Sequence, residues 1–280
     1  MNAAEKAQNE KRAQEHTTIM NSLYSTEINS SINRTIEYTG SGVYTLCNSE
    51  KRYYYTDIEL QNVTTSQAIA NNDLHGKVAV LNFASFKNPG GGFIHGMMAQ
   101  EEAICHDSFL YNVLSQKTSY YGWNREHLNS GLYRDRALYS PDVIFSSGKM
   151  VDVLTCAAPN LGPIIKYNKP VIKDIVKTQI ARVAFICSIL EKQQVDTVIL
   201  GAWGCGVFKN DPYTIAYLFD YFLSMLDGHF KRVIFAIPDA KYKPNYKAFD
   251  YMINKPHDLY EIIKPGKLLE ELSNYEKYLN

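Results

Sequence analysis

Three glycines and two glutamates lie close together in this chain and could do chemistry. The glycines, Gly90 to Gly92, follow the apolar segment KVAVLNFAS at 77–85, and the sequence Gln100-Glu101-Glu102 follows after a seven-residue spacer. Adjacent glycines cost chain entropy and provide no side-chain contacts. Adjacent carboxylates repel each other. Because neither feature favours a plain scaffold, we interpret the segment as a site.

The two glutamates have the chemistry to cleave a glycosidic bond. One carboxyl can act as general acid and then as general base, while the other orients sugar hydroxyls. Acidic residues also favour a helix N-terminus, which explains one glutamate better than two. Adjacent side chains on a helix diverge by roughly 100°. We therefore expect distinct roles for Glu101 and Glu102 rather than a symmetric pair.

A second glycine-rich segment, 201–208 (GAWGCGVF), follows the apolar run DTVIL. Glycine lets successive backbone N–H groups approach an anion, and a following helix N-terminus adds favourable partial charge. Ligands of open α/β sheets bind outside the carboxyl ends of the strands. Two such loops at one edge could hold a pyrophosphate between them, although either loop alone is more often a tight turn. Neither loop fits the Rossmann or Walker A pattern, which disfavours a dinucleotide dehydrogenase or a P-loop ATPase.

Histidine and cysteine supply no stronger candidates. His95 and His106 flank the Gln-Glu-Glu and His127 lies in a Tyr-rich stretch, but no spacing supports zinc. We expect surface or hydrogen-bonded core roles for these histidines. Cys205 has no evident histidine partner, so we expect it to pack or shape its loop. No nucleophile elbow surrounds Ser85.

Composition excludes further classes of function. The chain has 280 residues with 29 basic and 29 acidic side chains, a balance that disfavours general nucleic-acid or anionic-membrane binding. Its five cysteines lack CxxC spacing and suit a reducing compartment. The first 20 residues are too polar for a signal peptide, and no apolar run approaches the roughly 18 residues of a membrane span. We expect a soluble, intracellular, cytoplasmic protein.

The elements that must position these residues alternate between strand and helix. We predict one or two strands in 36–60 and a Thr-capped helix in 64–74, and the Tyr-rich stretch 119–131 suggests a loop. Further strands are expected at 77–85, 137–147, 151–160, 196–206 and 232–240, and helices at 100–114, 173–194, 213–230 and 267–278. This alternation predicts an α/β fold with a three-layer α/β/α mixed sheet. We expect an N-terminal helical or mobile extension, 1–35, and a single domain, 36–280.

Taken together, the motifs resemble those of the poly(ADP-ribose) glycohydrolases. The stretch NPGGGFIHGMMAQEE matches their triple glycine followed at family spacing by Gln-Glu-Glu, and LGAWGCGVFKNDP matches the second loop of the microbial branch, which is built on a macrodomain. The similarity runs from about residue 60 to about residue 240. A lone triple glycine would mean little, whereas both motifs and the second loop together are specific.

The resemblance implies roles for individual residues. Glu102 matches the catalytic acid/base, while Glu101 and Gln100 match residues that hold the ribose hydroxyls and orient the scissile bond. The other implied binding residues are the catalytic loop Gly90, Gly91 and Gly92, the diphosphate loop Gly204, Cys205, Gly206 and Val207, the aromatic Phe208, and, near the terminal ribose, Asn82, Ser85 and Asn88.

The implied activity is hydrolysis of the ribose–ribose bond of poly(ADP-ribose), exo-acting, with release of ADP-ribose and without a metal or other cofactor. The expected partners are poly(ADP-ribose) or ADP-ribosylated proteins, and we expect a monomer. Two alternatives stay open. One is a non-catalytic ADP-ribose-binding macrodomain, which would not need both glutamates. The other is a hydrolase of a different ADP-ribosyl linkage, such as mono-ADP-ribose on an amino acid.

Overall fold

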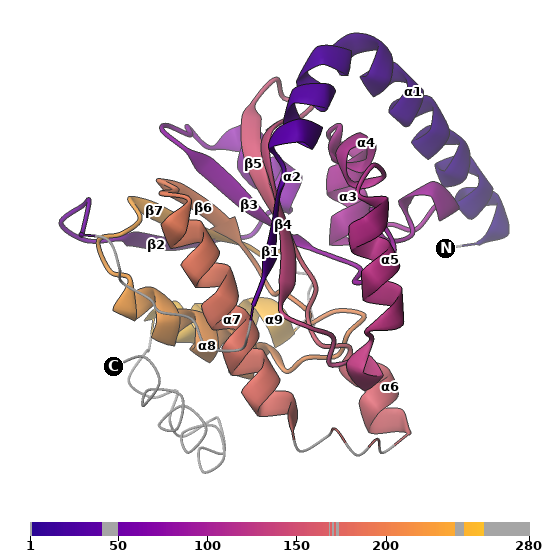
Figure 1. The fold of residues 1–280 in the computed structure, drawn as a ribbon. Coiled ribbons are helices and arrows are strands. Elements are labelled where there is room, and N and C mark those ends of the chain that lie inside the picture. The colour runs from indigo at the N-terminus through magenta and orange to yellow at the C-terminus, as the bar shows by residue number, and fades with distance from the viewer. Residues whose placement is uncertain are drawn as a thin grey trace.

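A mixed sheet lies between two layers of helices in the part of the chain that the computed structural model describes, residues 2–40, 50–167, 169, 171, 174–238 and 244–254 (Figure 1). Its strands are β1 Ile36–Thr39, β2 Asp57–Gln61, β3 Val78–Phe83, β4 Arg136–Ile144, β5 Met150–Cys156, β6 Thr197–Leu200 and β7 Arg232–Ala236. Their order is β1-β4-β5-β3-β6-β7-β2. β4 is antiparallel to both of its neighbours, and the pairs from β5 to β2 are parallel. The predicted three-layer α/β/α fold is confirmed.

Helices cover both faces of this sheet. They are α1 Ala3–Arg34, α2 Thr65–Asn71, α3 Gln100–His106, α4 Leu110–Leu114, α5 Thr118–Glu126, α6 Leu161–Lys166, α7 Ile175–Lys192, α8 Pro212–Met225 and α9 Pro244–Asn254. Side chains of α7, α8 and α9 form one buried cluster with the sheet, and those of α1 to α5 form another on the opposite face. Figure 1 shows these two groups of helices on either side of the strands.

Strand β3 occupies the middle of the sheet, which explains why its residues 78–81 are all apolar. Ala79 and Leu81 pack into the cluster with α7 and α8, whereas Val78 and Val80 pack into the cluster with α1 to α4. A strand that is buried on both faces needs a continuous apolar run rather than alternation. The glycine loop that follows β3 therefore starts from the rigid centre of the molecule.

Two predicted elements were wrong. The stretch 119–131, expected as a loop, contains α5, whose Tyr120, Tyr121 and Asn124 are buried. The single helix expected over 100–114 is two helices, since Ser108 leaves the helix to bridge Phe145. Helices α6 and α9 were not predicted, and the helix expected at 267–278 lies outside the described residues.

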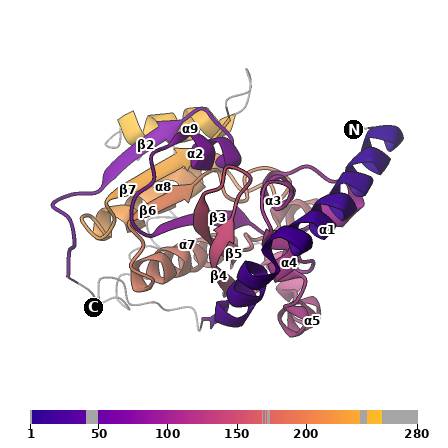
Figure 2. The same ribbon diagram turned by 90° about the horizontal axis from the view of Figure 1, so that it is seen from above.

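The N-terminal residues form a long helix that packs on the domain. α1 starts with a capping box in which Asn2 accepts from the Glu5 N–H and Glu5 accepts from the Asn2 N–H. It bends near Tyr24, where the backbone leaves helical geometry, and Figure 2 shows it running across α3 and α4. Its Ala13, Met20 and Ile28 are buried with sheet residues. The division at residue 35 stays a prediction.

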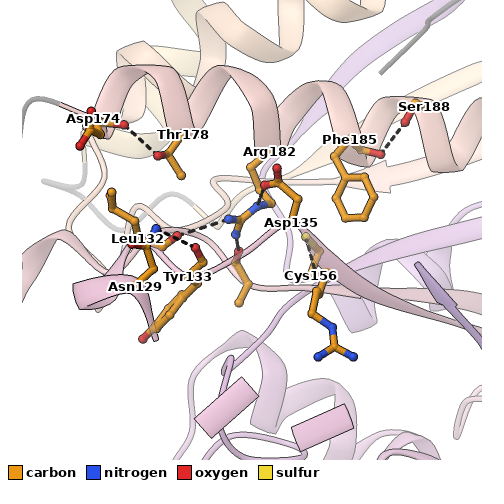
Figure 3. A network of polar contacts seen from close by, with 12 residues as sticks. Asn129, Leu132, Tyr133, Asp135, Cys156, Asp174, Thr178, Arg182, Phe185 and Ser188 are labelled. Atoms are coloured by element: carbon orange, nitrogen blue, oxygen red, sulfur yellow. Dashed lines mark hydrogen bonds and ion pairs between the residues drawn. The ribbon is translucent and has the colours of Figure 1, made fainter. Parts of the chain in front are cut away.

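A buried arginine ties α7 to the segments that flank the sheet (Figure 3). Arg182 donates from Nε to Asp135 Oδ1 at 2.5 Å and from Nη1 to the Ala157 carbonyl at 2.6 Å. Nη2 donates to the Leu132 carbonyl at 3.3 Å. A buried charge of this kind needs both an ion-pair partner and hydrogen bonds. The contacts hold the segment after β5 in place, and the second glycine loop packs on that segment.

Candidate active site

Both glycine loops leave the same edge of the sheet. The first follows β3 and the second follows β6, and these two strands are parallel neighbours. Their carboxyl ends therefore bring the loops side by side, at the position where ligands bind in open α/β sheets. The juxtaposition expected from sequence is present.

The triple glycine wraps over the first turn of α3. Gly90 and Gly91 have left-handed φ angles of +64° and +61°. A side-chain carbon on Gly91 would lie 2.5 Å from Glu102 Oε1 and 2.8 Å from Glu101 Oε2. One oxygen of each carboxyl therefore faces the same point of the loop. The two side chains converge, although neighbours on a helix diverge, because the loop folds across the helix N-terminus.

Glu102 is held by backbone N–H groups of its own loop. Oε1 accepts from the Gly92 N–H at 2.8 Å, and Oε2 accepts from the Ala99 N–H at 2.9 Å. Ala99 is the residue that precedes α3, so the second contact also caps the helix. The carboxyl is fixed in orientation directly beneath the glycine loop.

Glu101 is held against the end of β3 instead. Its Oε2 accepts from the Ser85 N–H at 2.6 Å, and its Oε1 accepts from Asn82 Nδ2 at 3.2 Å. Burial raises the pKa of Glu101 to about 8, with a further increase from the nearby Glu102 charge, while the hydrogen bonds from Ser85, Asn82 and Gly90 act in the opposite direction. Glu101 therefore holds its proton to a higher pH than an ordinary glutamate does.

Gln100 fastens α3 to the sheet. Its Oε1 accepts from the Phe83 N–H at 2.8 Å, and its Nε2 donates to the Leu81 carbonyl at 3.0 Å and to Thr65 Oγ1 at 3.2 Å. The side-chain amide thus bonds to β3 much as a neighbouring strand would. These contacts fix the start of α3, and with it both glutamates.

The N–H groups of the first loop are directed at the protein. Gly91 donates to the Asn88 carbonyl at 3.1 Å, Gly92 donates to Glu102, and Asn88 donates to Ser85 Oγ at 3.2 Å. We expected both loops to offer N–H groups to a pyrophosphate. The first loop instead uses its glycines for close approach to the carboxyls, which leaves the second loop as the better anion site.

The second loop has the free donors that the first one lacks. Among the described residues, none accepts a hydrogen bond from the N–H groups of Gly206, Val207 or Phe208. A side-chain carbon on Gly206 would meet nothing within 4 Å, and Val207 is 75% exposed. Successive free N–H groups on an exposed turn are a concave site for an anion. This geometry suits one phosphate or two linked phosphates.

Two side chains that sequence analysis missed support this loop from below. Asn210 Nδ2 donates to the Pro159 carbonyl at 2.9 Å and to the Gly204 carbonyl at 3.0 Å. Gln179 Nε2 on α7 donates to Asn210 Oδ1 at 2.8 Å. Gly204 has a φ of +74°, and a side chain there would lie 2.5 Å from the Ala158 side chain. Nothing in the local sequence marks Asn210 or Gln179, because their partners come from distant segments.

Aromatic side chains lie between the two loops. Phe86 stacks on Tyr133 with ring centroids 4.4 Å apart, and Phe208 tilts against Tyr133 at 6.2 Å. Phe208 is partly exposed and its carbonyl accepts from the Leu161 N–H at 2.8 Å. Tyr133 was not among the sequence candidates. It supports Phe208 from the side of the first loop.

The remaining candidates lie in varied positions. Asn82 is fully buried behind Glu101, Ser85 shapes the first loop, and Asn88 is exposed on it. Burial raises the pKa of Cys205, which disfavours a thiolate. Burial also lowers the pKa of His106 to about 4. No group of three or more His, Cys, Asp or Glu among the described residues could hold a metal ion.

The site thus combines two converging carboxyls with a loop after the adjacent strand whose free N–H groups could donate to an anion. Such a site can hydrolyse a glycosidic bond that lies beside a diphosphate. The family model of the microbial-type PARG catalytic domain matches residues 4–147, slightly more than half of the 280-residue chain. The chain therefore belongs to the microbial-type poly(ADP-ribose) glycohydrolases. It is an enzyme of the glycoside hydrolase class.

Solved structures of poly(ADP-ribose) glycohydrolases are similar to this chain in sequence and fold. The poly(ADP-ribose) glycohydrolase of Thermomonospora curvata is 27% identical, with a TM-score of 0.72 over 87% of this chain and 98% of that one. The Deinococcus radiodurans enzyme, solved with ADP-ribose, is 29% identical, with a TM-score of 0.70 over 82% and 98%. The T. curvata enzyme was also solved with the inhibitor ADP-HPD.

No relative was found among the curated proteins. No helix in the described part of the chain is long and apolar enough to cross a membrane.

Proposed function

We propose that this enzyme hydrolyses the ribose–ribose bond at the end of poly(ADP-ribose), with Glu102 as general acid and base. The observation that supports this most directly is the convergence of Glu101 and Glu102 on Gly91, next to the free N–H groups of the second loop. The D. radiodurans enzyme of this type binds ADP-ribose, the expected product. A ligand with a diphosphate next to a ribose fits both halves of the site.

In the proposed reaction, the Glu102 carboxyl donates its proton to the ribose oxygen of the leaving unit as the bond from that oxygen to the anomeric carbon breaks. The positive charge that develops on the terminal ribose is stabilised by the Glu102 carboxylate that remains after proton donation and by the diphosphate. A water molecule then adds to the anomeric carbon, and its proton returns to Glu102. The products are ADP-ribose and a polymer shortened by one unit, and the enzyme is unchanged.

We assign the acid/base role to Glu102 rather than Glu101 because of their contacts. Glu101 is bound to Asn82 and Ser85 at the end of β3, on the scaffold side. Glu101 also accepts from the Gly90 N–H of the loop. Both oxygens of Glu102, in contrast, are held by N–H groups of the loop and its spacer, Gly92 and Ala99. Glu101, whose raised pKa favours the protonated carboxyl, is suited to donate a hydrogen bond to a ribose hydroxyl. Gln100 and Asn82 act by positioning α3 and Glu101.

We assign the diphosphate to the turn Gly204–Phe208, with Phe208 against the ADP-ribose, and the terminal ribose to the first loop, Gly90–Gly92, with Ser85 and Asn88 beside it. The support is the row of free N–H groups in the second loop and the fixed carboxyls under the first. We further propose attack at chain ends only, by a cytoplasmic monomer made of the domain 36–280 and the extension 1–35.

The test is the release of free ADP-ribose from automodified poly(ADP-ribose) polymerase by wild type and Glu102→Gln. Loss of a general acid/base is expected to lower the rate by roughly 10² to 10⁴, while calorimetric binding of ADP-ribose is retained. Glu126→Gln, an exposed glutamate at the end of α5, is the matched control and should keep the wild-type rate. An active Glu102→Gln enzyme would show that the assignment is wrong.

The product pattern tests the chain-end proposal separately. Attack at chain ends gives ADP-ribose from the first turnovers, whereas cuts within chains give oligomers first. Long polymer of defined size, resolved on gels at early times, distinguishes the two. A substrate with a single ADP-ribosyl group on an amino acid, assayed in parallel, tests the linkage.

A further inference from the structure

The seven-residue spacer between the triple glycine and the glutamates carries exposed apolar side chains. Ile94 is 37% exposed, Met97 47% and Met98 50%. The spacer has no Lys, Arg, Asp or Glu. Exposed apolar side chains that gather in one place commonly mark a contact surface. This one directly adjoins the proposed acid/base.

Met97 and the Glu102 carboxyl flank the same residue. A side-chain carbon on Gly92 would lie 2.5 Å from Met97 Cγ and 3.6 Å from Glu102 Oε1. The Gly92 carbonyl accepts from the Met97 N–H at 3.0 Å, and the Gly92 N–H donates to Glu102 at 2.8 Å. Met97 is therefore the exposed apolar side chain next to the acid/base.

The spacer is rigidly supported rather than loose. The Gly92 carbonyl also accepts from the His95 N–H at 2.9 Å, and the Phe93 carbonyl accepts from the Gly96 N–H at 3.1 Å. Phe93 is fully buried, with its ring 4.6 Å from that of His106. From α1, Asn9 Nδ2 donates to the Gly96 carbonyl at 3.3 Å. The methionines are thus displayed on a fixed turn.

We propose that Met97 and Met98, with Ile94 beside them, form a platform for the adenine ring of the leaving unit of poly(ADP-ribose). This platform rests on the acid/base role proposed for Glu102. The leaving oxygen belongs to the ribose of an adenosine, so the adenine lies within a few bonds of the oxygen that Glu102 is proposed to protonate. A neutral purine fits an uncharged apolar platform, whereas a phosphate of the polymer does not. Methionine sulfur also makes favourable contacts with aromatic rings.

The test compares two leaving groups. The variant Met97→Ala/Met98→Ala is assayed on poly(ADP-ribose) and on an ADP-ribosyl substrate whose leaving group is 4-nitrophenol. Contacts of this kind correspond to a factor of about 2 to 10 for each methionine. We expect kcat/KM on the polymer to fall by about 10-fold more than on the nitrophenyl substrate. Replacement of both methionines by leucine should restore most of the loss.

Met150→Ala is the matched control. Met150 is 55% exposed and starts β5, at the opposite end of that strand from the site. The Met150→Ala substitution should leave kcat/KM unchanged on both substrates. Equal losses on both substrates would overturn the platform, because they would mean that Met97 only supports Glu102. An undiminished rate on the polymer would overturn it as well. The acid/base proposal is tested independently: it fails if the Glu102→Gln enzyme stays active.

Discussion

The two adjacent glutamates of the site differ because of what surrounds each carboxyl. Glu101 faces the end of β3 and is buried with Asn82, whereas Glu102 faces the glycine loop. Burial disfavours a charged carboxyl, and only part of that cost is offset by the N–H groups of Ser85 and Gly90. One residue of separation along the helix is therefore enough to place one carboxyl of the pair where burial raises its pKa well above the ordinary value.

The raised pKa of Glu101 predicts how stability depends on pH. The folded state keeps the Glu101 proton up to pH about 8, whereas the unfolded state loses it near the ordinary value of 4.5. Between these values the folded state binds more protons, so its stability falls as pH rises, by at most about 1.4 kcal/mol per pH unit. Below pH 4.5 Glu101 is protonated in both the folded and the unfolded state, so its contribution to stability is fully present.

Glu101→Gln should remove this dependence, because glutamine stays neutral. Urea unfolding of wild type and variant at pH 5, 6, 7 and 8 measures the difference in their free energies of unfolding. We expect the free energy of unfolding of the variant to increase relative to that of wild type at each step in pH. The contributions of other titrating groups cancel in the comparison. A difference that stays constant over this range would show that Glu101 is ionised throughout.

At the scale of elements, helix α1 supports the spacer and helix that follow the triple glycine. Gly96 has a φ of +70°, and its missing side chain leaves room for the Lys6 carbonyl of α1. His16 Nε2 donates to the Ser108 carbonyl at 2.8 Å, where α3 gives way to α4. The helix thus contacts both ends of the segment that carries the glutamates. Its position affects the site although it contributes no candidate catalytic group.

Gly96→Ala should therefore lower activity as well as stability. The left-handed backbone alone costs alanine about 1 to 2 kcal/mol, and the methyl group would also overlap the Lys6 carbonyl. Gly148→Ala is the matched control, since Gly148 has a φ of +78° with nothing within 4 Å. The midpoint of thermal unfolding and the rate of ADP-ribose release should both fall further in Gly96→Ala than in Gly148→Ala. Equal effects of the two substitutions would mean that α1 does not hold the spacer.

Sequence predicted the elements whose signal is local. Strands β3 and β6 are largely apolar runs ahead of glycine-rich loops, and Thr64 caps α2 as expected. The failures have non-local causes. α5 is rich in tyrosine, and its helical face becomes apparent only when Tyr120 and Tyr121 are buried against neighbours. The break after α3 comes from Ser108 pairing with Phe145, which is distant in sequence.

The residues of the site, like the elements, were predictable from sequence only where their signal is local. The glycines and glutamates were identified because their types and spacing are unusual on their own. The supporting contacts of Asn210 with Pro159 and of Gln179 with Asn210 join segments that only the folded chain brings together. The direction of N–H groups in the two loops was likewise invisible, because backbone orientation leaves no mark on residue type. Sequence therefore indicated the chemistry but not how it is divided between the loops.

At the scale of the whole molecule, one sheet carries both halves of the core. The cluster with α7 to α9 and the cluster with α1 to α5 each use side chains of β3 and β5. Neither helical layer can lose its packing without exposing the sheet on which the other depends. The N-terminal helix shares this core, so we expect the chain to unfold as a single unit.

Thermal unfolding with and without ADP-ribose tests that expectation. The two tryptophans, Trp123 on α5 and Trp203 in the second loop, report on opposite layers, and each can be followed alone in a Trp→Phe variant of the other. Without ligand, both probes should give the same midpoint as far-ultraviolet circular dichroism. ADP-ribose at about 100 times its Kd adds about 2.7 kcal/mol, which should raise the midpoint of both probes by about 5 °C. A ligand effect confined to Trp203, or an earlier transition at Trp123, would mean instead that the layer containing α1 unfolds independently of the second glycine loop.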